Sequence, residues 1–374
     1  MKRTSTEIPS LDAQKKELIE SDPRLTRRQA LQSMLLGGIA LAAAPVETLA
    51  AGMPTPSVPY LNDILGVGGD LRYQSTYRRG VVVEAKSKSV YPYNTYSANP
   101  ARALQQLDAV AMRLTGRTNP RDAWSSFVGP GDKVGVLLDA RGSRQSRVQG
   151  ATIKALIACL QRSGVRPNDI ILWTTNATEL SALGLRLNWS NRGVRIVGAN
   201  QLGYDSRYTY KVPGMFKPFV LSKIVTQHCN VLINLASLED HPVLGCRLCL
   251  AQEVTQAFSN GMLFERFWGG ARGLGILSLR PILKNKFVLH LIDGLAGQYN
   301  GNLGKWRPGV IIGGTDPVAV DRVGFAWIDT YRTQRGLTSI TNSRRSPLYL
   351  NQAANNGLGV ANLSQIKRIR LTLP

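Results

Sequence analysis

Residues 133–173 read KVGVLLDARGSRQSRVQGATIKALIACLQRSGVRPNDIILW, and this stretch decides the fold. It opens with a short apolar run at 133–138 and closes with another at 169–173, each typical of a buried strand. Between them, apolar residues from 153 to 160 recur at helical spacing, and Ser163-Gly164 provides the stop. A strand, a helix and a second strand in this order predict a βαβ unit.

The same alternation continues along the rest of the chain, at intervals of about 20–30 residues. Further apolar runs predict strands at 80–85, 193–197, 230–235, 286–292 and 310–312. Helical patterns occur at 100–115, 245–258, 274–283 and from Pro317 onward. We therefore expect an α/β fold with a mixed, mainly parallel sheet and helices on both faces. One such domain is expected over 80–374, after an extended lead-in at 51–79.

The composition describes a folded, strongly basic protein. The 374 residues include 46 Lys and Arg against 24 Asp and Glu, a net charge of +22. Such a surface attracts polyanions, although charge alone does not choose among them. Four cysteines exclude a disulfide-dense small fold, and three histidines leave little room for a multi-histidine metal site.

The N-terminus is typical of an export signal. Arg27-Arg28 precedes an apolar run at 34–44, and the small residues of Thr48-Leu49-Ala50 follow Pro45. This order is similar to a twin-arginine signal peptide over 1–50, which implies transport of the folded protein to the periplasm or outside the cell. The apolar run is too short to cross a bilayer core of about 30 Å. An interfacial helix or a short uncleaved anchor is the alternative. After residue 50 the chain retains 39 basic and 18 acidic residues, so the charge belongs to the mature protein.

Polar residues follow the apolar runs, and in open α/β sheets ligands bind beyond the carboxyl ends of the strands. From these positions we select candidates for substrate binding and for catalysis. The substrate-binding candidates are Asp139, Arg141, Asn176 and Asp321, and the catalytic candidates are His241, Asp293 and Asp316.

Each candidate has a chemical role and a structural alternative. His241 can act as a general acid or base near neutral pH. Alternatively, it is a structural loop histidine whose hydrogen-bonding groups are paired with its neighbours. Arg141, with Arg144 and Arg147 in the same loop, can clamp a phosphate or carboxylate group, or form a solvated face. Asp293, before Gly294, can point into a cleft or form a turn.

For the other candidates the alternative is helix capping or burial. Asp316 before Pro317 is a strong helix start as well as a cleft carboxylate, and Asn176 is a second possible N-cap. Asp321 lies one turn further on and needs a partner if it is buried. Oxygen ligands from Asp293 and Asp316 could assist Mg²⁺ or Ca²⁺, but no metal ligand is assigned.

Cys246-Arg247-Leu248-Cys249 forms a C-x-x-C pair. Three interpretations remain open: small core residues or a structural disulfide, a redox pair, or half of a metal site. A lone pair of this kind is a weak signal without a second pair at zinc-site spacing.

Several stretches together resemble the family known as domain of unknown function 362, in its twin-arginine-exported branch. They are VGVLLDARG (134–142), SGVRPNDIILWTTNATEL (163–180), CNVLINLASLEDHPVLGCRL (229–248), IDGLAGQYNG (292–301), GTDPVAVDRVG (314–324) and NNGLGVANLSQI (355–366). The resemblance implies an α/β fold and no defined reaction. Some relatives carry a ferredoxin-like domain, but this sequence has no C-x-x-C-x-x-C-x-x-x-C-P run, so the cofactor stays unknown.

The chain departs from that family at polar positions. Relatives usually have Lys where Glu239 stands, Lys-Asn where Ala251-Gln252 stands, and Thr-His-Pro near Gln145-Ser146-Arg147. Two functions are therefore expected as alternatives. One is an exported enzyme acting on a small anionic substrate in a strand-end cleft. The other is a non-catalytic basic module that docks on anionic cell envelope or on an acidic partner. The export machinery is a further expected partner, and nucleic acid is not expected.

Overall fold

The computed structural model describes residues 76–91, 97–141, 146–266, 270–301, 303–341, 343 and 345–374. These residues belong to one compact unit, Val58–Pro374. The predicted export signal at 1–50, most of the lead-in and Arg144 lie outside the described residues. In the part of the chain that is described, no helix is both long and apolar enough to cross a membrane.

A mixed sheet organises the molecule, in the order β12-β1-β11-β9-β7-β2-β3-β4. β11 is antiparallel to both of its neighbours, whereas the other pairings along this path are parallel. The predicted α/β class, with a mainly parallel sheet, is confirmed. The strands of this path are β1 (Val81–Ser87), β2 (Val134–Leu138), β3 (Ile170–Thr174), β4 (Arg195–Gly198), β7 (Val231–His241), β9 (Phe287–Asn300), β11 (Val310–Gly314) and β12 (Lys367–Leu373).

The βαβ unit predicted from residues 133–173 is present as β2, helix α7 and β3. Helix α7 spans Gly150–Arg162 and buries Ile153, Leu156 and Leu160 against the sheet. β2 and β3 are fully buried and pair in parallel, with Val134 opposite Ile170. Continuous apolar runs are what strands covered on both faces require.

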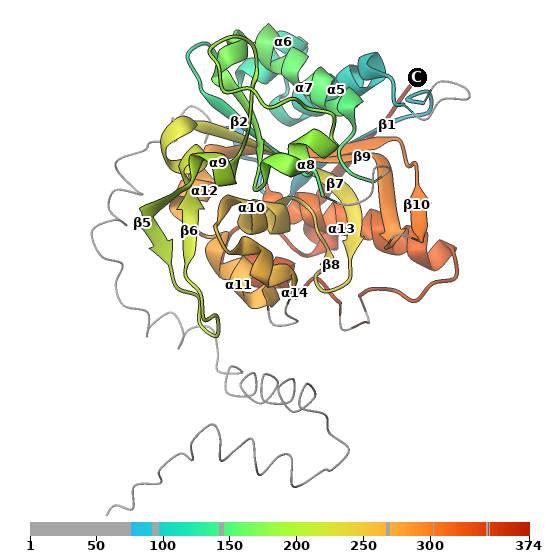
Figure 1. Ribbon diagram of the computed structural model, residues 1–374. Helices are drawn as coiled ribbons and strands as arrows, with labels where there is room; N and C mark the ends of the chain where they lie inside the picture. The colour runs from blue at the N-terminus through green and yellow to red at the C-terminus, as the bar shows by residue number, and fades with distance from the viewer. Residues whose placement is uncertain are drawn as a thin grey trace, which may run out of the picture. The chain divides into compact units, whose positions relative to one another are not determined.

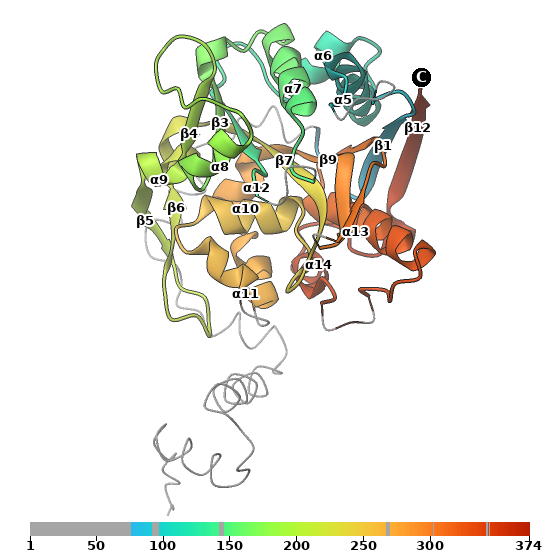
Figure 2. The ribbon, with the colours of Figure 1, turned by 45° about the vertical axis from the view of Figure 1, so that its right-hand side comes forward.

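Helices cover both faces of the sheet (Figures 1 and 2). On one side lie α5 (Pro100–Thr115), α6 (Pro120–Ser125) and α7, which pack on one another. The other side carries α10 (Cys249–Ala257), α11 (Gly270–Leu277), α12 (Pro281–Lys286), α13 (Pro317–Gln334) and α14 (Leu348–Asn355). The short helices α8 (Ala177–Ala182) and α9 (Ala199–Leu202) follow β3 and β4.

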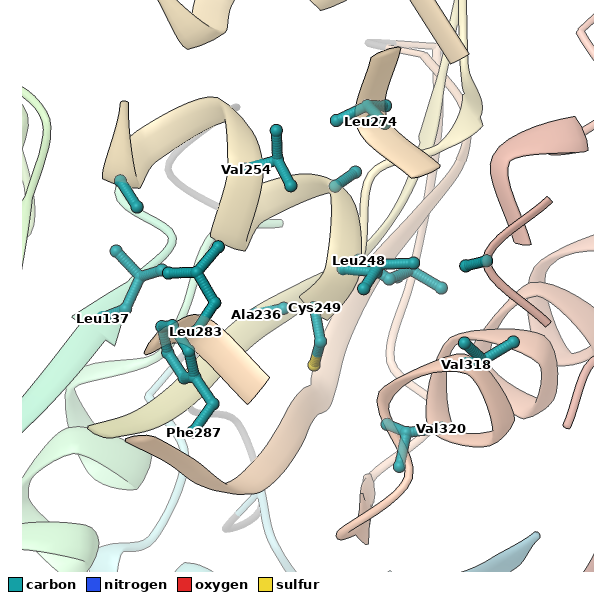
Figure 3. Packing of buried hydrophobic residues seen from close by; sticks show 14 of the residues in the cluster. Leu137, Ala236, Leu248, Cys249, Val254, Leu274, Leu283, Phe287, Val318 and Val320 are labelled. Atoms are coloured by element: carbon teal, nitrogen blue, oxygen red, sulfur yellow. The ribbon is translucent and has the colours of Figure 1, made fainter. Parts of the chain in front are cut away.

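The sheet separates two apolar clusters. The cluster on the α5–α7 side includes Leu107, Trp124 and Leu156, all within 1% of full burial. The larger cluster, on the α10–α14 side, includes Leu137, Leu248, Val254 and Phe287. Figure 3 shows part of this second cluster, with Leu283 and Phe287 next to one another below α10 and with Val318 and Val320 on the side of α13.

Several elements differ from the sequence predictions. The predicted helix at 274–283 is two helices, α11 and α12, because Pro281 cannot continue a helix and instead begins the second one. β7 and β9 extend well past their apolar cores, to His241 and Asn300. These extensions pair with two short return strands, β8 (Gly245–Cys246) and β10 (Gly304–Trp306). A separate hairpin of β5 (Tyr204–Tyr210) and β6 (Phe219–Ser222) was not predicted.

Candidate functional site: a buried ion cluster at the strand ends

Three of the predicted site residues lie together at the carboxyl ends of β2 and β7. Asp139 directly follows β2 and is fully buried. Its Oδ2 accepts a hydrogen bond of 2.6 Å from the Ser237 hydroxyl on β7. Arg141 is held two residues further on, where its backbone N–H donates to Asp139 Oδ1 at 3.2 Å. His241 ends β7.

Arg247 is the centre of the cluster, and the sequence analysis did not select it. Its Nη2 lies 3.2 Å from Asp139 Oδ1 and contacts Glu239 Oε1, while Nη1 lies 3.9 Å from Glu265 Oε2. The β7–β8 hairpin carries Arg247 back beside Glu239, whose carbonyl accepts its backbone N–H at 3.3 Å. Burial on its own lowers the pKa of Arg247, but three carboxylates, Asp139, Glu239 and Glu265, outweigh it and raise that pKa.

Arg141 forms the second cationic position. Its Nη1 lies 2.8 Å from Glu265 Oε1, and its Nη2 donates to the Thr255 hydroxyl at 3.0 Å. The side chains of Arg141 and Glu265 are 9% and 7% exposed. Burial, with the neighbouring charge of Arg247, lowers the pKa of Arg141. Because the Arg141 guanidinium is already paired with Glu265, an anionic ligand must compete with Glu265 for it.

His241 lies at the more open side of the cluster, with its side chain 14% exposed. Nδ1 accepts the backbone N–H groups of Val243 and Leu244, both at 3.2 Å. In the neutral ring the proton is therefore on Nε2, which lies 3.7 Å from Glu265 Oε2. Burial lowers the pKa of His241 to about 4, although the Glu265 carboxylate opposes this. At neutral pH the imidazole is uncharged.

The charges of the cluster favour the protonation of one of its carboxyl groups. Among the described residues, three buried carboxylates, Asp139, Glu239 and Glu265, are paired with two guanidinium groups, those of Arg141 and Arg247. A buried uncompensated charge is costly, so one carboxyl tends to keep its proton. Burial raises the pKa of Glu239 to about 8 against the effect of Arg247. Glu239 Oε2 is buried and has no hydrogen-bond partner among the described residues.

Asp293 belongs to the same edge of the sheet but supports the backbone. It lies opposite Ser237 in the pairing of β7 with β9. Its Oδ2 accepts the backbone N–H of Gln149 at 2.7 Å, just before α7, and its Oδ1 accepts that of Leu295 at 3.0 Å. Burial raises the pKa of Asp293 to about 6, and these two N–H groups oppose the shift. The turn predicted at Asp293-Gly294 is not formed, because both residues lie within β9, and Asp293 supports the backbone instead.

The structure does not bring Asp316 to this cluster, contrary to the expectation that the catalytic candidates line one strand-end cleft. β11 runs opposite to β9, with Gly314 beside His290 and Val310 beside Gly294, so Asp316 lies at the other edge of the sheet. The reason is the short return through β10, which has no room for the crossover that parallel strands need. A metal ion shared by Asp293 and Asp316 is excluded by the same geometry.

Asp316 caps α13 and ties three segments together. It accepts backbone N–H groups of Ala319 at 3.0 Å, Gly80 at 2.9 Å and Val360 at 3.1 Å. Burial raises its pKa, and these N–H groups oppose the shift. The capping alternative predicted for Asp316-Pro317 is therefore the one that the contacts support.

Asp321 and Asn176 also serve the backbone. Asp321 accepts the N–H groups of Cys249 at 2.8 Å and Leu250 at 2.9 Å, which fixes the start of α10. Burial raises its pKa to about 8. Asn176 is the exposed N-cap of α8 and accepts the N–H of Thr178 at 3.2 Å.

The C-x-x-C pair consists of two separate buried thiols. All four cysteines are buried and free. Cys246 Sγ lies 3.4 Å from the Tyr349 hydroxyl, and Cys249 Sγ lies 3.4 Å from the Leu291 carbonyl oxygen. Burial raises the pKa of both thiols, which makes them poor nucleophiles. The contacts support the interpretation as core residues.

Sequence analysis missed Arg247, Glu265 and Thr255. Arg247 stands inside the C-x-x-C pair. Glu265 is one of 24 acidic residues in a chain with 46 basic ones, and this scarcity of acidic residues could have drawn attention to it. In the described ranges, no group of three or more His, Cys, Asp and Glu side chains is placed to hold a metal ion. A scan against models of known protein families gives no match, and no curated protein matches the chain.

Proposed function

We propose that the protein is an exported acid–base enzyme whose active site is the strand-end ion cluster and whose substrate is a small anion. The observation that carries this proposal is the buried ion cluster itself, in which the described residues supply three carboxyl groups, Asp139, Glu239 and Glu265, and two guanidinium groups, Arg141 and Arg247. A folded protein gains little stability from such a cluster, because desolvation offsets the attraction. Perturbed ionisable groups of this kind gather at functional sites.

The residues have distinct roles in this proposal. Arg141 binds the anionic group of the substrate in exchange for Glu265, at the side of the cluster where His241 is partly exposed. Glu239 is the proton donor, since it holds a proton near neutral pH. Arg247 and Asp139 are positioning residues that hold Glu239 in place. The protein would reach its compartment by the twin-arginine signal, as a member of the family known as domain of unknown function 362.

Binding of small anions is the first test. Thermal unfolding of the purified protein is followed with a panel of small carboxylates and phosphate esters. We expect at least one anion to raise the midpoint for the native protein and for Arg166→Gln, because the side chain of Arg166 is 70% exposed. We expect no rise for Arg141→Gln, and a reduced one for Arg141→Lys, which keeps the charge. If every anion raises the unfolding midpoint of Arg141→Gln as much as that of the native protein, the proposed binding of the anion by Arg141 is disproved.

Turnover is the second test. The anions that bind are incubated with the protein, and their conversion is followed by NMR. We expect Glu239→Gln to keep the binding of the anion and to lose its conversion, because the amide holds the same shape without a transferable acidic proton. Conversion by Glu239→Gln at the native rate would remove Glu239 from the mechanism.

A second candidate function is attachment to an anionic membrane surface, and one exposed patch favours it. Residues 181–204 contain Arg186, Arg192 and Arg195 but no acidic residue. Leu187 and Trp189 in the same segment are 44% and 40% exposed, and the Arg195 guanidinium lies 5.1 Å from the Trp189 ring. Exposed Trp and Leu among arginines are typical of a membrane-interface contact.

Vesicle sedimentation tests this second function. It predicts binding to vesicles rich in phosphatidylglycerol, no binding to phosphatidylcholine vesicles, and release as salt rises from about 50 to about 500 mM. Trp189→Ser with Arg192→Ser should abolish binding, whereas Arg166→Gln should not. Equal binding to both kinds of vesicle would contradict it.

A further inference from the structure

A pocket of about 530 Å³ opens at the edge of the sheet opposite the ion cluster. It lies where β9 begins and α13 starts, and it is bounded by α12 and by Thr76 and Tyr77. Pockets that bind small molecules usually have volumes of about 300–1,000 Å³. Nothing assigned to the ion cluster lines it, so it is a separate place on the molecule.

The walls of the pocket are largely apolar. The apolar lining residues are Leu279, Pro281, Leu283, Phe287, Val288, Pro317 and Leu358. Figure 3 shows two of them, Leu283 and Phe287, side by side beneath α10. The lining includes one lysine, Lys284, which is exposed and therefore hydrated.

Glu253 of α10 lines this pocket and is 3% exposed. Its Oε2 is buried and has no hydrogen-bond partner within the described residues. Burial, with the added effect of Asp321, raises the pKa of Glu253 well above its usual range. Asp321 itself is occupied by the backbone N–H groups of Cys249 and Leu250, so it offers Glu253 no partner. Burial therefore favours the neutral form of the Glu253 carboxyl, which can donate a hydrogen bond from its O–H.

His290 of β9 lines the same pocket and is 2% exposed. Its Nδ1 is buried and also lacks a partner among the described residues. Burial lowers the pKa of His290 to about 3, so the ring is neutral. The His290 ring stacks on the Phe287 ring, with the two ring centroids 5.9 Å apart.

Two unpartnered buried polar groups on one pocket point to a ligand. Burial of a polar group without a hydrogen bond is unfavourable, and native proteins keep few such groups. Stability alone is better served by apolar residues at positions 253 and 290. A molecule bound in the pocket would supply such partners, and the apolar walls match a largely apolar body.

The charge of that molecule follows from the same groups. An anion would lose its hydration in a largely apolar pocket whose lining lysine, Lys284, is exposed and keeps its own hydration, so desolvation of the anion would not be compensated. An organic cation would have to ionise Glu253 and to pass Lys284, in a protein with a net charge of +22. An uncharged acceptor such as a carbonyl oxygen needs neither.

We propose that this pocket is a second ligand site, which binds a small, uncharged and mainly apolar carbonyl compound. Glu253 donates a hydrogen bond to the carbonyl oxygen, and His290 provides the second polar contact. This site is independent of the function proposed for the ion cluster.

Three fluorinated probes of matched size test the charge preference by ¹⁹F NMR. They are 4-fluoroacetophenone, 4-fluorobenzoate and 4-fluorobenzylamine, measured with the whole purified protein at neutral pH. We expect the ketone to bind and the anion and the amine to bind at least about tenfold more weakly. No binding of the ketone at millimolar concentration, or tighter binding of either charged probe, overturns the proposal.

Substitutions at position 253 locate the ketone. Glu253→Leu removes the donor and should weaken binding about tenfold, the effect of one buried hydrogen bond. Glu253→Gln keeps a donor and should stay within about threefold. Gln252→Leu is the matched control, because Gln252 is equally buried on the same helix but does not line the pocket. Equal binding by Glu253→Leu and Gln252→Leu overturns the proposal.

Stability provides the independent reading. If Glu253 is kept for a ligand, Glu253→Leu should raise the unfolding midpoint by about 2 °C or more while it weakens binding. A lower midpoint for Glu253→Leu means that the carboxyl has a structural role, which also overturns the proposal. Neither result depends on whether Arg141 binds an anion.

Discussion

Arg247 and Asp139 form a buried ion pair, with Nη2 3.2 Å from Oδ1 and side chains that are 5% and 0% exposed. The pair joins residues 108 positions apart in the chain. It links the end of β2 to the β7–β8 hairpin, and Glu239 contacts the same guanidinium. Each member of the cluster is therefore held by charges from other segments.

Removal of Arg247 should destabilise the fold strongly. Arg247→Met leaves Asp139 and Glu239 buried without their main cation, and breaking a buried pair in this way costs about 3–5 kcal/mol. Urea unfolding at pH 7 measures the loss. Arg166→Met is the control, because its pair with Asp169 is 70% exposed on the arginine side and should cost less than about 1 kcal/mol. Equal losses for the two variants would contradict the role of Arg247.

The proton on Glu239 predicts a pH dependence of stability. The pKa of Glu239 is raised from 4.5 to about 8 in the folded protein. A raised pKa means that the folded state holds this proton more tightly than the unfolded state does. The stabilisation is complete below about pH 4.5 and is lost as the pH rises towards 8, by at most about 1.4 kcal/mol per pH unit.

Glu239→Gln cannot titrate and gives the reference for this effect. The free energy of unfolding of the native protein, relative to Glu239→Gln, should fall between pH 5 and pH 8, within the interval that the raised pKa of Glu239 defines. Urea titrations at several pH values supply both curves. A constant difference, or one that grows with pH, would show that Glu239 is ionised in the folded protein.

Two glycines with the same backbone angle should respond differently to alanine. Gly245 and Gly357 both have φ of +80°. A Cβ at Gly245 would lie 1.9 Å from the Arg345 carbonyl oxygen, whereas a Cβ at Gly357 has nothing within 4 Å. Gly357→Ala should cost about 1 kcal/mol for backbone strain, and Gly245→Ala about 4 kcal/mol.

The measurement is the free energy of unfolding of both variants under identical conditions. Since Gly245 lies in the return that carries Arg247, the Gly245→Ala variant should also weaken anion binding at Arg141. Similar costs for the two substitutions would mean that the segment around Arg345 gives way without strain.

Removal of the N-cap Asp316 should destabilise the fold more than removal of the N-cap Asn176, because Asp316 holds three segments of the chain together. Asp316→Ala leaves the N–H groups of Gly80, Ala319 and the partly buried Val360 without their acceptor and should cost about 3 kcal/mol or more. Asn176→Ala removes one exposed cap and should cost about 1 kcal/mol. Thermal unfolding compares them, and a smaller loss for Asp316→Ala would contradict this reading. Because Asp316 is remote from the ion cluster, Asp316→Ala should retain anion binding by Arg141.

The structural roles of Asp316 and Asn176 were within reach of the sequence, and so were the βαβ units. Helix starts and buried strands depend on residues a few positions apart, so their spacing alone indicates them. The boundaries of α5 at Pro100–Thr115 agree with the helical pattern for this reason. The same local signals placed Asp139, Arg141 and His241 at strand ends.

The composition and periodicity of the sequence by themselves determined the α/β class, the basic surface and most of the strands. Only the tertiary structure decided that β11 runs against β9, which takes Asp316 away from Asp139, and that Arg247 and Glu265 complete the ion cluster. It also decided that Glu253 and His290 share one pocket. The physical reason is that ion pairs and pockets join residues far apart in the chain, whose distance depends on strand direction and packing rather than on sequence spacing.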